Sequence, residues 1–120
     1  MKICQIEEIK AWQEARELTK KIYQISGNGQ FAKDYRLRDQ IRGASGSVMA
    51  NIAEGFDSQS DMEFIRFLSY SRRSATEVQS HLYVALDQKY INNNIFNDIY
   101  LQVKAIKSLI CGFIRYLNGK

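Results

Sequence analysis

The stretch LRDQIRGASGSVMANIAEGF, Leu37–Phe56, decides the fold of this chain. Apolar side chains recur in it at steps of three or four residues, which is the spacing of one face of an α-helix. This face consists of Leu37, Ile41, Ala44, Val48 and Ile52. The pattern therefore predicts an amphipathic helix over about residues 35–55.

Two glycines lie in the middle of this predicted helix. Gly43 and Gly46 each cost roughly 1 kcal/mol relative to alanine in a helix interior. We expect that a second helix backbone approaches closely here, because such a contact would offset the cost. Gly55 is expected to end the helix, since glycine tolerates the left-handed conformation that follows many helices.

Three further helices are predicted from the same spacing, at about residues 6–26, 61–88 and 95–117. A capping box of Ser60 and Glu63 opens the third helix. The segment 30–33 is expected to be a short connection, followed by Asp34 as the N-cap of the second helix. Asn93 or Asn94 is expected to cap the fourth helix.

Each of these three helices has one apolar face. The first face consists of Ala11, Ala15, Leu18, Ile22 and Ile25. The face of the third helix consists of Phe64, Leu68, Ser71, Ala75, Val78, Leu82 and Leu86. That of the fourth consists of Ile95, Ile99, Val103, Ile106, Ile110, Phe113 and Leu117. Helices of about 20 residues with short connections predict an all-α, antiparallel up-down-up-down four-helix bundle, a single domain over residues 1–120.

The composition agrees with such a fold. Of the 120 residues, 45% are hydrophobic and 25% charged, which is ordinary for a soluble globular chain, and none is proline. No apolar run approaches the roughly 20 residues of a membrane span, and the N-terminus lacks the pattern of a signal peptide. We therefore expect a cytoplasmic protein with no membrane partner, in which Cys4 and Cys111 are free thiols.

The residue patterns of enzymes are missing from the sequence. His81 is the sole histidine and is predicted on the solvent-exposed face of its helix, which argues against histidine metal sites and Ser–His or Cys–His pairs. The glycines follow no predicted strand, so they form no phosphate-binding loop, and the carboxylate motif of bundle metal sites is absent. The sequence therefore predicts a protein that is not an enzyme and needs no metal or cofactor.

Basic residues offer a route to a partner. The chain carries 17 Lys and Arg against 13 Asp and Glu, a formal net charge of +4 that is compatible with nucleic acid. Candidate phosphate contacts are Lys20, Lys21, Arg38, Arg42, Arg72 and Arg73. Arg38 and Arg42, one helical turn apart, could clamp phosphates through forked guanidinium contacts. The alternative is that neighbouring acids hold these side chains in solvated ion pairs, each contributing less than ~1 kcal/mol.

The fourth predicted helix is apolar around much of its circumference, which indicates more than one neighbour. We expect an intersubunit surface that includes Trp12, Tyr100, Leu101 and Leu109. Trp12 could instead cover the edge of its own bundle.

Asn51 and Glu54 flank the apolar face of the central stretch and have two interpretations. In the structural one, Asn51 bonds a neighbouring helix or the following loop, and Glu54 pairs with a basic side chain. In the functional one, these two side chains contact a ligand or nucleic acid.

Several motifs occur together along the chain. They are Trp12-Gln13-x-Ala15, Leu37-Arg38-Asp39-Gln40-Ile41-Arg42, Ser47-Val48, Asn51-Ile52-Ala53-Glu54-Gly55, Glu63-Phe64 and Ala75-x-Glu77. With them the chain resembles, over about residues 9–117, the four-helix-bundle family of the bacterial 23S rRNA-intervening-sequence protein, which is similar to the accessory proteins of diversity-generating retroelements. Ala32 and Met49-Ala50 stand where that family usually has prolines, and Gly43 replaces a common basic residue.

The resemblance implies a ring-shaped homo-oligomer, a homopentamer, and in its retroelement branch the binding of nucleic acid and a reverse transcriptase. It also implies that Asn51, Glu54 and Gly55 form a family motif with a structural role. The expected function is therefore a non-enzymatic oligomeric platform that contacts the phosphates of structured RNA or DNA. The alternative is a protein–protein interaction scaffold that binds no nucleic acid.

Overall fold

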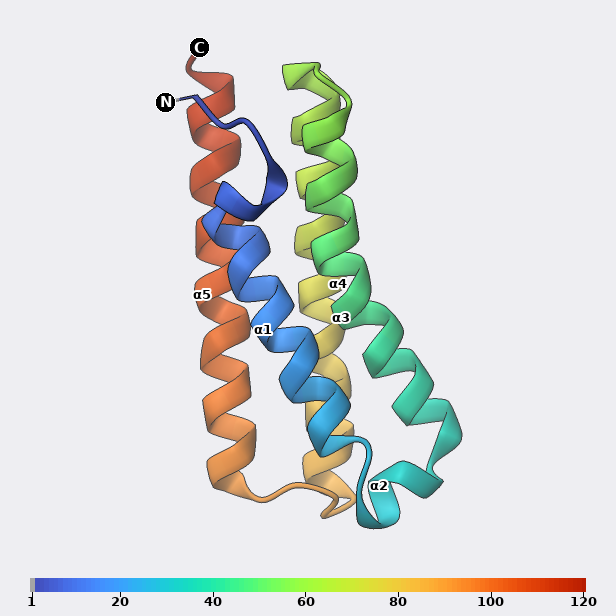
Figure 1. Ribbon diagram of the computed structural model, residues 1–120. Helices are drawn as coiled ribbons and strands as arrows, with labels where there is room; N and C mark the ends of the chain where they lie inside the picture. The colour runs from blue at the N-terminus through green and yellow to red at the C-terminus, as the bar shows by residue number, and fades with distance from the viewer. Residues whose placement is uncertain (1) are drawn as a thin grey trace.

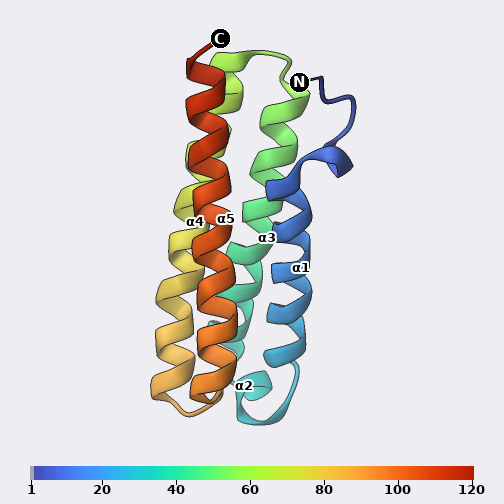
Figure 2. The same ribbon diagram turned by 90° about the vertical axis from the view of Figure 1, so that its left-hand side faces the viewer.

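The computed structural model describes residues 2–120, and these residues form an all-helical fold without strands. Its elements are the 3-10 helix η1 (Ile6–Glu8) and the helices α1 (Lys10–Ile25), α2 (Gly29–Lys33), α3 (Tyr35–Asp57), α4 (Asp61–Asp87) and α5 (Asn93–Asn118). The four long helices lie side by side, and consecutive ones run in opposite directions (Figure 1). The N-terminal segment and the end of α5 lie at one end of the bundle and α2 at the other (Figure 2). The predicted all-α class is confirmed.

The core runs along the axis of the bundle, where α3 packs against α1 and α4, and α5 packs against α4 and α1. Its largest fully buried side chains include Leu18, Ile22, Ile41, Ile52, Leu68, Leu82, Ile99, Ile106 and Ile110. The apolar faces predicted for α3 and for most of α1 are buried. Apolar periodicity at helical spacing therefore identified the core of the first half of the chain.

The fourth predicted core face was wrong at its start. Ile95 is 37% exposed, and the adjacent Phe96 is buried in its place. Phe96 packs its ring on Tyr83 of α4 at 4.9 Å between centroids, a contact that the sequence spacing could not show. The predicted N-cap, Asn93 or Asn94, was also wrong, because the side chain of Asn92 accepts the backbone N–H of Ile95 at 2.9 Å and caps α5.

The predicted face of the third helix needs a smaller correction. Leu86 is only half-buried, whereas Gln79 and Ala85 are buried. Gln79 can be buried because its side-chain oxygen accepts a hydrogen bond from Lys107 of α5 at 3.0 Å. The side of α4 that faces α5 is therefore partly polar.

The first predicted helix, residues 6–26, is divided in the structure. Ile9 is extended (φ −83°, ψ 116°) and 99% removed from solvent, and it separates η1 from α1. The carboxylate of Glu8 accepts the backbone N–H groups of Gln5 and Cys4 at 3.0 and 3.2 Å. These bonds satisfy donors at the start of η1, so the chain turns there before α1 begins.

The expected connection at residues 30–33 forms the short helix α2 instead. Phe31 is buried and stacks on Tyr90, with ring centroids 5.3 Å apart. The Tyr90 hydroxyl donates to Asp34 Oδ2 at 2.9 Å, and this bond is the main cause that raises the pKa of Tyr90. Asp34 Oδ1 accepts the N–H of Leu37 at 3.1 Å, which confirms the predicted N-cap of α3. This Asp34–Tyr90 bond fastens the α2–α3 corner to the α4–α5 turn.

The glycines of α3 have roles opposite to those expected. Gly55 does not end the helix, because α3 continues to Asp57. A Cβ at Gly55 would lie 2.8 Å from Phe64 Cδ1 and 2.9 Å from Phe67 Cβ, so the glycine allows α4 to approach α3 closely. At Gly43 and Gly46, no atom lies within 4 Å of such a Cβ, so the close contact predicted there is absent within residues 2–120.

We expect Gly55→Ala to destabilise the bundle by about 1–3 kcal/mol, because the added methyl group overpacks the contact with Phe64 and Phe67. Gly43→Ala is the matched control, since it adds the same group to the same helix in open space. It should stabilise by about 0.5–1 kcal/mol through helix propensity. Urea unfolding of both variants checks the pair, and equal shifts would contradict the close α3–α4 approach.

Candidate nucleic-acid interface

Arg42 is turned toward its own bundle. Its Nε donates to Ser26 Oγ at 2.8 Å and its Nη2 to the carbonyl of Tyr23 at 3.4 Å, and the guanidinium lies 4.5 Å from the Tyr23 ring centroid. The C-terminal carbonyls of a helix lack partners within the helix and carry partial negative charge. Arg42 therefore caps the end of α1 from α3, and these donors are no longer free for a phosphate.

Arg38 also has partners within the chain. Its Nη1 donates to the carbonyl of Ala32 at 3.2 Å and its Nε to Asp39 Oδ1 at 2.9 Å. The guanidinium lies 4.8 Å from the ring centroid of Tyr35. Arg38 and Arg42 thus do not form an open clamp: Arg38 pairs with a neighbouring acid, as the alternative expected, whereas Arg42 bonds the end of α1 and no acid within residues 2–120.

The two candidate lysines of α1 lie on different sides of that helix. Lys21 pairs with Asp98 of α5 at 3.1 Å, whereas Lys20 lies 3.9 Å from Glu17 on its own helix. The structure therefore brings Lys20 and Lys21 into separate surroundings, each with a carboxylate nearby.

Arg72 and Arg73 of α4 are exposed, and neither makes an ion pair within residues 2–120. Adjacent residues of a helix point about 100° apart, so the two belong to different faces. Arg73 lies 5.9 Å from the ring centroid of Tyr70, close to Arg66. Arg66 is held by Glu63, and their hydrogen bonds lower the pKa of Glu63. Arg72 instead shares a side of α4 with Gln79, seven residues later, which bonds Lys107 of α5.

Arg72 begins a stripe on α4 that matches a stripe on α5. The α4 stripe is Arg72, Thr76, Gln79 and Tyr83, and the α5 stripe is Tyr100, Lys104, Lys107, Cys111 and Arg115. Both have the three-and-four spacing of one helical face. The hydrogen bond between Gln79 and Lys107 joins the stripes, as does the edge contact of Tyr83 with Tyr100 at 5.7 Å.

We call Arg72, Lys104, Lys107 and Arg115 the α4–α5 basic face. The chain has no acidic residue from Ile99 to its last residue, so α5 offers these cations no carboxylate beside them. Glu77 is the one acidic residue of α4 between residues 64 and 86, and it lies 3.3 Å from His81, on another side of the helix. The face therefore combines four positive charges with neutral neighbours, which is an arrangement suited to anions.

The other polar predictions are corrected by the structure. His81 is not on an open surface, since its side chain is only 15% exposed beside Glu77. Asn51 donates to the carbonyl of Ser47 at 2.9 Å, within α3, rather than to a neighbouring helix or the following loop. Glu54 is exposed and has no basic partner among the described residues. The predicted ion pair of Glu54 was therefore wrong.

The four candidates for an intersubunit surface do not share one face. Tyr100 stacks on Phe96 at 5.2 Å, toward α4, and Leu109 is half-buried against the core. Trp12 is half-buried too, on the side of α1 where Thr19, two turns later, bonds the carbonyl of Ser45 in α3. Trp12 thus covers the edge of the bundle. Leu101, 62% exposed, is the one of the four that faces solvent.

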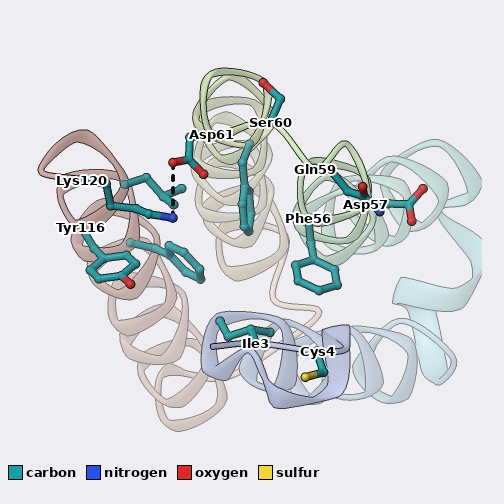
Figure 3. A pocket seen from close by; sticks show the side chains of 12 residues that line it. Ile3, Cys4, Phe56, Asp57, Gln59, Ser60, Asp61, Tyr116 and Lys120 are labelled. Atoms are coloured by element: carbon teal, nitrogen blue, oxygen red, sulfur yellow. Dashed lines mark ion pairs between the residues drawn. The ribbon is translucent and has the colours of Figure 1, made fainter. Parts of the chain in front are cut away.

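A cavity of about 490 Å³ opens at the end of the bundle that holds both termini (Figure 3). Phe56, Phe64 and Phe113 line it together with Ile3 and Cys4 of the N-terminal segment. At its rim Asp61 and Lys120 pair with each other at 3.4 Å, and Asp57 points away from it in Figure 3. The cavity is lined by phenylalanines and has a satisfied ion pair at its rim, so we interpret it as a loosely packed end of the core.

We expect Arg42→Ala to lower the free energy of unfolding by about 1–3 kcal/mol, because it removes charged hydrogen bonds from the end of α1. Arg36→Ala is the control on the same helix, since Arg36 is exposed and makes no ion pair within residues 2–120. It should stay within about 0.5 kcal/mol of the parent protein. Chemical denaturation distinguishes them, and equal losses would argue against the capping role.

No potential metal site of three or more His, Cys, Asp or Glu side chains occurs within the described residues. Nor does any helix in that part of the chain have the length and apolar character required to cross a bilayer.

The fold is similar to a known crystal structure. That structure is a protein of unknown function from the S23 ribosomal protein family of Bacteroides thetaiotaomicron VPI-5482, with a TM-score of 0.80 and 25% sequence identity. The match covers 87% of this chain and 97% of the other. No curated protein matches the chain. The family model of the 23S rRNA-intervening sequence protein matches residues 7–112, which is most of the chain. The chain therefore belongs to the 23S rRNA-intervening sequence protein family.

Proposed function

We propose that this protein is a non-enzymatic nucleic-acid-binding protein that contacts phosphates through the α4–α5 basic face. The observation that carries the proposal is that Arg72, Lys104, Lys107 and Arg115 make no ion pair with a carboxylate within residues 2–120. A cation already paired with a carboxylate gives up that partner when it binds a phosphate, whereas an unpaired cation gives up only water and counterions. Because the family description refers to an intervening sequence of 23S rRNA, a structured RNA is the first ligand to test.

The cations of the opposite side support this choice by contrast. Lys20, Lys21 and Arg38 lie beside carboxylates, and Arg42 is bound to the end of α1. Phosphate binding there would compete with these contacts, and those of Lys21 and Arg42 join different elements of the bundle. The α4–α5 basic face can bind an anion without such a loss.

We expect the double variant Arg72→Gln/Lys104→Gln to weaken RNA binding and to lower the slope of log affinity against log salt by about 1.5, since each lost phosphate contact removes about 0.7–0.9. Arg16→Gln/Arg36→Gln is the control, because it removes the same charge from two exposed arginines of α1 and α3 that form no ion pair within residues 2–120. It should leave the slope near that of the parent protein. Fluorescence anisotropy over a salt series measures both.

Two results would contradict the proposal. Equal slopes in the two double variants would show that only net charge matters and not this face. Parent affinity that does not change with salt would favour the alternative, a scaffold that binds another protein through apolar surface, such as a reverse transcriptase.

We also propose that copies of the chain associate through the outer side of α5. Leu101 is 62% exposed and Tyr116 is 42% exposed on that helix, and the half-buried Leu109 lies between them in the sequence. Water-exposed leucine and tyrosine along one helix gain from burial against a second copy. Association into a ring, such as a pentamer, would repeat the α4–α5 basic face around a symmetry axis and multiply the phosphate contacts.

We expect Leu101→Lys to lower the oligomeric mass while the helical content stays unchanged, because a charge at a buried interface is costly and the side chain lies outside the core. Met62→Lys is the control, since Met62 is 81% exposed at the start of α4. Light scattering gives the mass and circular dichroism the helicity. A Leu101→Lys protein with the parent mass would refute this interface.

A further inference from the structure

Tyr83 is an exposed aromatic side chain that continues the α4–α5 basic face. It is 49% exposed and follows Gln79 by four residues, so the two lie on one side of α4 about 6 Å apart along the helix axis. Gln79 holds the ammonium group of Lys107 at 3.0 Å. An exposed ring therefore lies about one helical turn from a fixed positive charge.

The ring of Tyr83 is supported by two other rings. Phe96 lies 4.9 Å away at an interplanar angle of 60°, and Tyr100 lies 5.7 Å away at 75°. Both belong to α5, and Phe96 is itself buried. Because its neighbours meet it at steep angles rather than parallel to it, they brace the ring without stacking on it.

Lys107 keeps capacity for a ligand. An ammonium group has three N–H donors, and the bond to Gln79 uses one of them. Lys107 is half-buried and faces no carboxylate on α5, so its position is defined and its charge is not neutralised there. A phosphate held by its remaining donors would bring the attached nucleoside within reach of Tyr83.

From this arrangement we infer that Tyr83 stacks an unpaired nucleobase whose phosphate lies on the α4–α5 basic face, so that the protein prefers single-stranded or looped segments to duplex. The inference rests on the proposed nucleic-acid binding. A base inside a duplex has both its faces covered by its neighbours, whereas an unpaired base can leave the stack and pair its face with an aromatic side chain. The ligand class is thus an RNA or DNA segment with unpaired bases.

The test compares a labelled single strand with a blunt duplex of the same sequence by fluorescence anisotropy at one low salt concentration. Tyr83→Ala should weaken single-strand binding by about 5-fold or more, since stacking contributes about 1–3 kcal/mol per base. Duplex binding should change by less than about twofold, because the phosphate contacts remain. Tyr83→Phe keeps the ring and should restore single-strand binding, which shows that the ring and not the hydroxyl is needed, while unchanged duplex binding of Tyr83→Ala separates stacking from any loss of packing around Phe96.

Tyr35→Ala is the matched control, because Tyr35 is a 65% exposed tyrosine at the start of α3, outside the α4–α5 stripes. It should bind both probes like the parent protein.

A Tyr83→Ala protein that loses affinity for both probes equally, or that loses no more affinity than Tyr35→Ala, overturns the stacking inference alone. Parent protein that binds neither probe overturns it together with the proposed function, whereas Arg72→Gln/Lys104→Gln should weaken both probes. RNA and DNA strands of the same sequence show whether the sugar is also recognised.

Discussion

The close packing of α3 against α4 is the contact on which the rest of the bundle depends. Gly55 brings the helices together near one end, and farther along them the buried Ser71 hydroxyl donates to the carbonyl of Val48 at 2.7 Å. Two such contacts fix the rotation of α4 about its own axis as well as its distance from α3. Once that rotation is set, the Arg72–Tyr83 stripe is turned toward α5. The α4–α5 basic face thus depends on the packing of α3 against α4, although α3 contributes no residue to that face.

Basic side chains have different roles on the two sides of the bundle. On the α1 and α3 side, basic groups hold elements together: Lys21 reaches across to Asp98, and Arg42 ends α1. On the α4 and α5 side, the helices meet through aromatic rings, through the hydrogen bond that Lys107 donates to Gln79 and, at one end, through the ion pair of Asp61 with Lys120. Arg72, Lys104 and Arg115 make no ion pair within residues 2–120, and Lys107 uses one of its three N–H donors, so these cations are available to a partner.

The sequence predicted the features that depend on local pattern and missed those that depend on distant partners. Periodicity located the four long helices and the core of α3. The N-cap at Asp34 could be predicted because its partner, Leu37, is only three residues further along the chain. Gly55 was misread because a glycine near a helix end is compatible with a left-handed cap and with close packing alike, and Phe64 decides between them. Arg42 was misread because its partner Ser26 lies on another helix. The α4–α5 basic face had a visible signal, the absence of acidic residues after Asp98, but the facing stripe of α4 emerges only from the packing.

The Asp34–Tyr90 bond makes the two ends of the bundle respond differently to alkali. Because the pKa of Tyr90 is raised in the folded chain, its contribution to stability is complete below the ordinary tyrosine value of about 10 and is lost as the pH rises through the folded value. The end that holds α2 should then open first, which amide hydrogen exchange would detect as faster exchange there. The opposite end, where phenylalanines surround a cavity, should respond first to pressure instead, because unfolding eliminates that void.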